Sequence, residues 1–450
     1  MASPITILHH GHESKYTDKI NTILDEYQIN HPINPPANTR THCNYINTIA
    51  TTYISILNDK NNNTTTTTSA QLAPLYSPAT APLILYNIFK DTHKDYNKFL
   101  KWYRETSPTL DLRRILKTNE NNNPEYSTYY KTLFNPSDKN RTPLHRLLYD
   151  NLFIPFDIIC CGEIFPITYK HYVSKNKDGI TDVDINVYMI DNDNTSASDF
   201  DINIVVRIIE FFRRINKAND VQLTIFYCDQ KKYLPLQRGD MITTENINSG
   251  CTHVGEYIYV WRKEECYKVL IHELIHYFSM DFHEYNYEVL GDMLRDVIHI
   301  DGKDVANEAY TEILAVTINS MMIGINASLQ SWQKIMSEVI ARENLYTHMQ
   351  VAKIIYHFGG TKYDDLFKIT IKQNTSLASY IIAKGALLYN YPMVMKYFDG
   401  VRDLDNFEVV YRDALNNMFN RDVVNAFLRD LDKFGTGFAR NTLRMTISEI

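Results

Sequence analysis

The segment HELIH at residues 272–276 restricts the fold of this chain more than any other part of the sequence. Residues four apart on an α-helix point the same way, so two imidazoles at this spacing can share one metal ion. The glutamate between them, Glu273, is then placed to act as a general base on water. Apolar residues of helical period surround the motif without Pro or Gly, and they predict a helix over residues 263–280.

A catalytic zinc site needs a third protein ligand and keeps a fourth position for water. The segment NEAYTE at residues 307–312 offers two acids, Glu308 and Glu312, at helical i,i+4 spacing. HExxH alone also fits a buried helix whose histidines bind no metal, so these acids are the second part of the evidence. The sequence therefore predicts one zinc ion (Zn2+) bound by His272, His276 and a downstream glutamate.

Together, HELIH and NEAYTE resemble the gluzincins, the thermolysin-like clan of zinc metallopeptidases, in which an N-E-x-x-x-D/E stretch follows the HExxH helix. The resemblance implies that Glu308 is the third metal ligand and that Glu312 orients His272. It covers residues 256–312, and it departs from thermolysin in a longer stretch between His276 and Glu308.

The longer run from INSGCTHVGEYIYVW through HELIHYFSMDF, with the later EAYTEILA, is also similar to HExxH proteins encoded by giant, nucleocytoplasmic large DNA viruses. The Asn and Thr tracts of the chain fit such a source. This resemblance implies an intracellular location, in host cytoplasm or virion, and other virion proteins as candidate partners.

Three other ligands compete with Glu308 for the metal. A metzincin places a third histidine six residues after the second, but Phe282 stands there and His283 is one residue late. Cys251 would be the cysteine ligand of a deformylase, which lacks a counterpart of the NEAYTE helix. Asp281 could bind a metal, although its place at the end of the predicted helix fits a cap or turn better.

Hydrophobic patterns divide the chain into three regions and predict an α+β, zincin-like fold. Residues 1–150 hold Tyr-rich amphipathic segments and predict a mostly helical accessory region. Residues 151–300 hold the short runs FDIICC, INVYMI, VQLTIFYC and EYIYVW, with a helix at 203–216, and predict a small mixed sheet that packs on the HExxH helix. Residues 301–450 predict a mainly helical subdomain that carries the third ligand.

Polar, low-complexity tracts at residues 58–70, 118–125 and 191–201 lack apolar side chains to bury. They predict surface loops or disordered insertions. The segment after Gly435 is also polar, and we expect it to extend or to dock loosely.

Composition and charge exclude several classes of protein. The 46 Lys and Arg are scattered among 53 Asp and Glu, and a net charge of −7 gives no basic surface for nucleic acid. The sequence has no apolar run of 18 residues and predicts no membrane span. Its first residues lack the charged and apolar regions of a signal peptide. Six cysteines are too sparse for a disulfide framework and predict reduced thiols.

The expected function is zinc-dependent hydrolysis of peptide bonds in a peptide or protein substrate, with Glu273 as general base. A further donor must stabilise the oxyanion; the candidates are Tyr356, His357 and Tyr380, and Tyr380 is preferred. The resemblance to the gluzincins implies that the strand at residues 256–261 forms the sheet edge and pairs with extended substrate. A core strand that binds no ligand is the alternative. The alternatives are another HExxH hydrolase, or a virion-associated structural or interaction protein that retains the metal site without proteolysis.

Overall fold

The structure is a computed structural model. It describes residues 15–30, 43–59, 65–72, 158, 167–175, 181–190, 200–217, 220–228, 230–235, 237–281, 288–431 and 442–450. Several expectations lie outside these residues: most of the FDIICC strand, the tract at 118–125, most of the tract at 191–201, and both Phe282 and His283. No helix in the described part of the chain is both long enough and apolar enough to cross a membrane.

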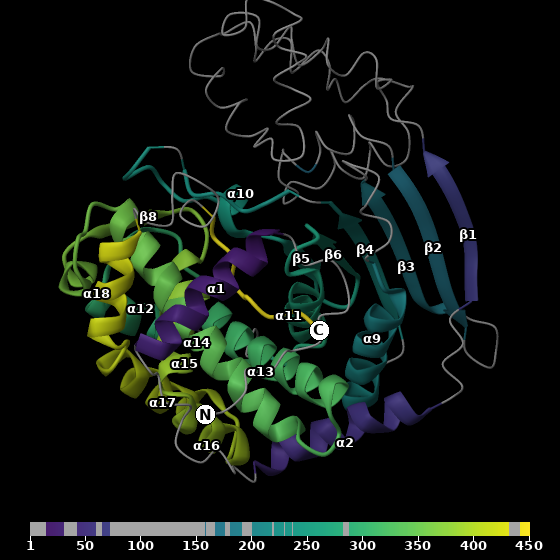
Figure 1. Ribbon diagram of the computed structural model, residues 1–450. Coiled ribbons are helices and arrows are strands. Elements are labelled where there is room, and N and C mark those ends of the chain that lie inside the picture. The colour runs from purple at the N-terminus through teal and green to yellow at the C-terminus, as the bar shows by residue number, and fades with distance from the viewer. Residues whose placement is uncertain are drawn as a thin grey trace, which may run out of the picture.

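Six strands of the described chain form one mixed sheet in the order β1-β2-β3-β4-β6-β5 (Figure 1). The strands are β1 (Thr65–Leu72), β2 (Ile167–Lys175), β3 (Thr181–Ile190), β4 (Val221–Tyr227), β5 (Gly250–His253) and β6 (Tyr257–Trp261). The central strands β3, β4 and β6 are parallel, whereas the β1–β2, β2–β3 and β5–β6 pairs are antiparallel. A mixed sheet within an α+β fold is thus confirmed.

Both edges of this sheet are strands that the sequence did not predict. The sequence predicts a loop at residues 58–70, but Thr65–Leu72 pairs with β2, because β-branched threonines suit a pleated strand. For residues 256–261 the sequence leaves an edge strand and a core strand open, and the core placement is the one found. A turn with Gly255 at φ +72° folds the chain into a hairpin, so β5 forms the edge and β6 lies between β4 and β5.

Helices make up most of the remaining described chain. They are α1 (Lys15–Asn30), α2 (Asn44–Asn58), α9 (Ile202–Asn216), α10 (Thr244–Ile247), α11 (Cys266–Tyr277), α12 (Glu288–Val297), α13 (Asn307–Ala327), α14 (Trp332–His357), the 3-10 helix η3 (Tyr363–Phe367), the π-helix η4 (Ala378–Ala383), α15 (Lys384–Tyr389), α16 (Tyr391–Asp399), α17 (Leu404–Asn416) and α18 (Arg421–Asp430). Strands β7 (His299–Gly302) and β8 (Thr370–Gln373) form a separate parallel pair. Helix α11 packs against β5 and β6 of the sheet and against α9 and α13, so it lies between the sheet and the helices of the C-terminal half (Figure 1).

The described N-terminal helices belong to the same hydrophobic core as α11. Ile20 and Leu24 of α1 and Tyr53 of α2 are buried in one cluster with Leu270 and Leu274 of α11. These helices therefore pack on the rest of the protein through apolar side chains.

Helix α11 contains the whole HELIH segment but is shorter than the predicted 263–280. Its first residue follows Glu265, whose backbone is left-handed at φ +73°. At its other end Ser279 is left-handed at φ +53°; its N–H binds the carbonyl of His276, and the N–H of Met280 binds that of Ile275. These two bonds form a Schellman motif, which ends the helix three residues early.

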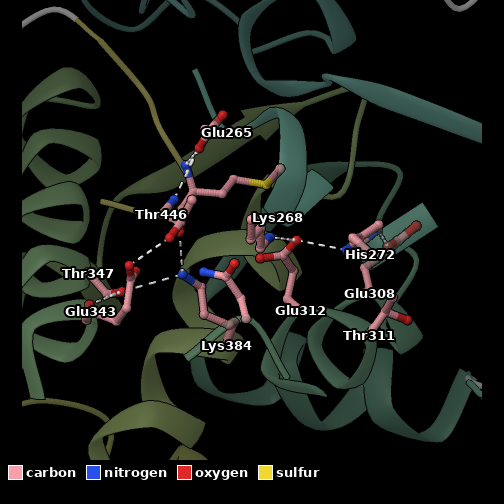
Figure 2. A network of polar contacts seen from close by, with 12 residues as sticks. Glu265, Lys268, His272, Glu308, Thr311, Glu312, Glu343, Thr347, Lys384 and Thr446 are labelled. Carbon is pink, nitrogen blue, oxygen red and sulfur yellow. Dashed lines mark hydrogen bonds and ion pairs between the residues drawn. The ribbon is translucent and has the colours of Figure 1, made fainter. Parts of the chain in front are cut away.

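Residues 442–450 are not a loose tail, which corrects the expectation for the segment after Gly435. Thr442, Leu443 and Thr446 are completely buried. Polar residues can be buried here because acids accept their backbone N–H groups. Glu265 accepts from the backbone of Met445 and Thr446, and Glu343 accepts from the Thr446 hydroxyl (Figure 2). Glu343 also accepts from the backbone N–H groups of residues 447 and 448.

We expect Glu343→Ala to lower the free energy of unfolding by about 1 to 3 kcal/mol. The buried N–H of Ile447 loses its acceptor, and the Thr446 hydroxyl and the partly buried Ser448 N–H each lose one of two acceptors. Urea denaturation followed by circular dichroism measures this loss. Glu338→Ala on the same helix is the control, since its contact with Lys334 spans 3.9 Å between exposed side chains and contributes less than about 0.5 kcal/mol. Equal losses in the two variants would contradict the anchoring role of Glu343.

Candidate metal centre

Helices α11 and α13 bring three candidate ligands together. His272 and His276 lie one turn apart on α11, and Glu308 lies in the first turn of α13. The two Nε2 atoms are 3.0 Å apart, and each is 3.3 Å from Glu308 Oε2. A tetrahedral ion with bonds of about 2.0 to 2.1 Å places its ligand atoms about 3.3 Å apart. This group could therefore hold a metal ion, and its geometry fits a tetrahedral one.

The outer nitrogen of each histidine faces a carboxylate. Nδ1 of His272 lies 2.8 Å from Glu312 Oε1, and Nδ1 of His276 lies 2.7 Å from Asp281 Oδ2. The His276–Asp281 contact is a hydrogen bond, whereas the His272–Glu312 contact is an ion-pair distance without hydrogen-bond geometry. Carboxylates at both Nδ1 atoms favour the tautomer that has the proton on Nδ1 and leaves Nε2 to face the centre. Both rings are thus oriented for metal binding.

Asp281 lies just after the end of α11, as the sequence suggests, and its side chain has contacts that the sequence did not predict. It contacts the Nδ1 side of His276 and also accepts hydrogen bonds from Asn307 Nδ2 at 3.1 Å and from Thr311 Oγ1 at 3.4 Å. Asp281 therefore supports His276 rather than replacing Glu308 as a ligand. The residue follows directly after the turn that ends α11, a position from which its side chain can reach back to the helix.

Charges within the site favour a cation between the two histidines. Burial acts to lower the pKa of His276, but Glu308 and Asp281 outweigh it and raise that pKa well above its ordinary value. Burial acts to raise the pKa of Glu308. The two histidines outweigh burial and hold this pKa far below its usual range. The carboxylates therefore attract positive charge to the centre, whether a proton or a metal ion.

Glu273, the expected general base, is held against the edge strand β5. Its Oε2 accepts a hydrogen bond of 2.7 Å from Thr252 Oγ1. A Cβ atom at Gly250 would lie 2.4 Å from Glu273 Oε1, so only glycine leaves room for this carboxylate. Burial raises the pKa of Glu273, which suits a base that works near neutral pH. The roles of Gly250 and Thr252 were missed in the sequence, although both lie in the SGCT segment before the predicted strand.

Of the three oxyanion candidates, Tyr380 is the one whose ring packs beside His272. This residue lies in the π-helix η4, and its ring centroid is 6.1 Å from that of His272. Burial first, and then the charge of Glu308, raises its pKa well above the ordinary value. Tyr356 instead lies under the Arg238 guanidinium, and His357 Nε2 lies 2.9 Å from the carbonyl of Asp240.

Cys251, the ligand expected of a deformylase, lies on β5 and takes no part in a disulfide among the described residues. Among the described residues, the three-ligand group is made of His272, His276 and Glu308 without it. The sequence matches no known protein family, and no curated protein or solved structure matches it.

We expect Glu308→Ala to abolish tight metal binding, because it removes one of three ligand atoms. We expect Asp281→Ala to weaken metal binding about tenfold to a hundredfold, because it only releases the His276 ring. Metal content after dialysis and competition with a chelator measure both effects. Asp292→Ala is the control, since this acid is mostly exposed on α12. Metal retained in Glu308→Ala but lost in Asp281→Ala would show that the ligand set is wrong.

Proposed function

We propose that this chain is a zinc metallopeptidase that hydrolyses peptide bonds. The observation that carries the proposal is the joint placement of the three-ligand group with Glu273 on the same helix. Two imidazoles and one carboxylate are a donor set of catalytic zinc sites. The same set binds Fe(II) in oxygenases, but a buried glutamate next to the first histidine favours hydrolysis.

The order of elements supports a zincin-like fold for this function. Helix α11 follows the β5–β6 hairpin and packs on both strands, and the third ligand comes from the helical part that follows. Strand β5 has β6 on one side and no strand on its other side within the described chain. An extended peptide can add to such an edge, and here it would lie beside Glu273.

A zinc ion at this site would activate water and polarise the scissile carbonyl as a Lewis acid. Glu273 removes a proton from the attacking water as its oxygen bonds to the carbonyl carbon. The same carboxyl then gives that proton to the amide nitrogen as the C–N bond breaks. The Tyr380 hydroxyl donates a hydrogen bond to the oxyanion that forms on the substrate carbonyl oxygen.

We expect Glu273→Gln to retain zinc and the fold but to lose about 10² to 10⁴ in rate, because it removes the base and leaves the ligands. A peptide-library digest with wild type and variant, with and without chelator, measures the loss. Elemental analysis of the same samples reports the metal. Wild-type protein that holds zinc and cleaves no peptide would instead favour the non-proteolytic alternative, a structural or interaction protein.

Tyr380→Phe tests the oxyanion donor. We expect kcat to fall by about 10² to 10³, with a small change in KM, because the hydroxyl acts on charge that develops in the transition state. Tyr356→Phe is the matched control and should leave kcat unchanged, since this tyrosine stacks on Arg238. If both variants keep the wild-type kcat, another group stabilises the oxyanion.

A further inference from the structure

The metal-binding face of α11 continues one turn beyond the histidines. Lys268 precedes His272 by four residues, as His272 precedes His276. The opposing face of α13 carries Glu308 and Glu312, also four residues apart. Acids and bases therefore alternate between the helices along an acid–base ladder, defined as Lys268, Glu312, His272, Glu308 and His276 in spatial order.

Lys268 forms an ion pair with Glu312 in the first step of this ladder. Its Nζ contacts Glu312 Oε1, and both side chains are completely buried. The same Oε1 atom lies 2.8 Å from Nδ1 of His272, so one carboxylate oxygen joins the lysine to the histidine (Figure 2). Lys268 thus acts on the carboxylate that holds the first metal ligand.

A second lysine lies near Glu312 but has its own partners. Lys384 Nζ donates to the carbonyl of Met445 at 2.9 Å and to Thr347 Oγ1 at 3.4 Å. The turn that carries Lys268 is also anchored, because the carboxylate of Glu449 accepts its backbone N–H at 3.4 Å and that of Tyr267 at 3.2 Å. Lys268 is therefore the lysine held in direct contact with Glu312.

We propose that Lys268 is a positioning residue of the metal centre. It fixes the carboxylate of Glu312, which in turn holds the His272 ring with Nε2 toward Glu308. A buried ion pair contributes little net stability, because desolvation offsets the attraction, but a carboxylate without its partner loses its fixed orientation. The inference rests on the metal binding of the proposed function and concerns affinity and ligand geometry rather than proton transfer.

The test measures the Kd for Zn2+ by chelator competition, with the absorption spectrum of the Co2+-loaded protein as a second readout. We expect Lys268→Met to weaken zinc binding about tenfold to a hundredfold, as for loss of other groups that orient a metal-bound histidine. We also expect it to shift the Co2+ bands, because His272 changes its angle to the metal. Should the methionine variant not fold, Lys268→Gln carries the same test.

Lys232→Met is the matched control. Lys232 and Glu265 are also completely buried and form an ion pair of 2.7 Å at the start of α11. This variant should lower the free energy of unfolding but leave the zinc Kd within about twofold of wild type. An equal loss of zinc affinity in Lys268→Met and Lys232→Met would show that Lys268 acts only through the stability of the protein. That result would overturn the inference.

A double-variant cycle tests whether Lys268 acts through Glu312. The variant with Lys268→Met and Glu312→Gln together should bind zinc within about twofold of Glu312→Gln alone. A zinc affinity of the double variant tenfold weaker than that of Glu312→Gln would contradict the inference that Lys268 acts through Glu312. Wild-type affinity in Lys268→Met would overturn the inference and leave the proposed function standing, whereas wild-type protein that binds no zinc would overturn both.

Discussion

The contact between α11 and α13 is the interaction on which the metal centre depends. The acid–base ladder places each of its two carboxylates between two basic side chains. It can do so because both helices repeat their ionisable residues every four positions. The early residue of α11 meets the late residue of α13, so the helices are antiparallel at this contact. A buried charge without a partner costs several kcal/mol. A shift of either helix by one residue would separate all the acid–base contacts between α11 and α13 at once.

The rest of the fold holds this pair of helices in register. The sheet packs on α11 from one side through β5 and β6. Residues 442–450 lie close to the opposite end of the ladder, where Glu449 accepts N–H groups from the first turn of α11. This contact satisfies donors that a helix start leaves open, and burial raises the pKa of the Glu449 carboxyl to about 8. The alignment of His272 with Glu308 thus depends on segments far apart in the sequence.

Local spacing identified the two histidines and the pair of acids, because HELIH and NEAYTE each lie within one helix. The resemblance to the gluzincins was needed to assign Glu308 as the ligand and Glu312 as the partner of His272. Extending the same spacing one turn back would also have found Lys268. The errors concern contacts between distant segments. A threonine tract became strand β1 because β2 offers a partner, and the polar residues 442–450 are buried because Glu265 and Glu343 accept their N–H groups. Neither partner can be read from the local sequence.

The edge strand β5 connects substrate binding to the base. Thr252 donates one hydroxyl proton to either of two acceptors on Glu273, Oε2 at 2.7 Å and the backbone carbonyl at 3.1 Å. The carboxylate rests on Gly250, where a Cβ would collide with it. Glu273 is therefore oriented by the strand to which a peptide would add, before any peptide binds. Such preorganisation avoids the cost of reorienting a base during a reaction. Under the proposed function, the two residues of β5 that contact Glu273 would therefore contribute to catalysis by position alone.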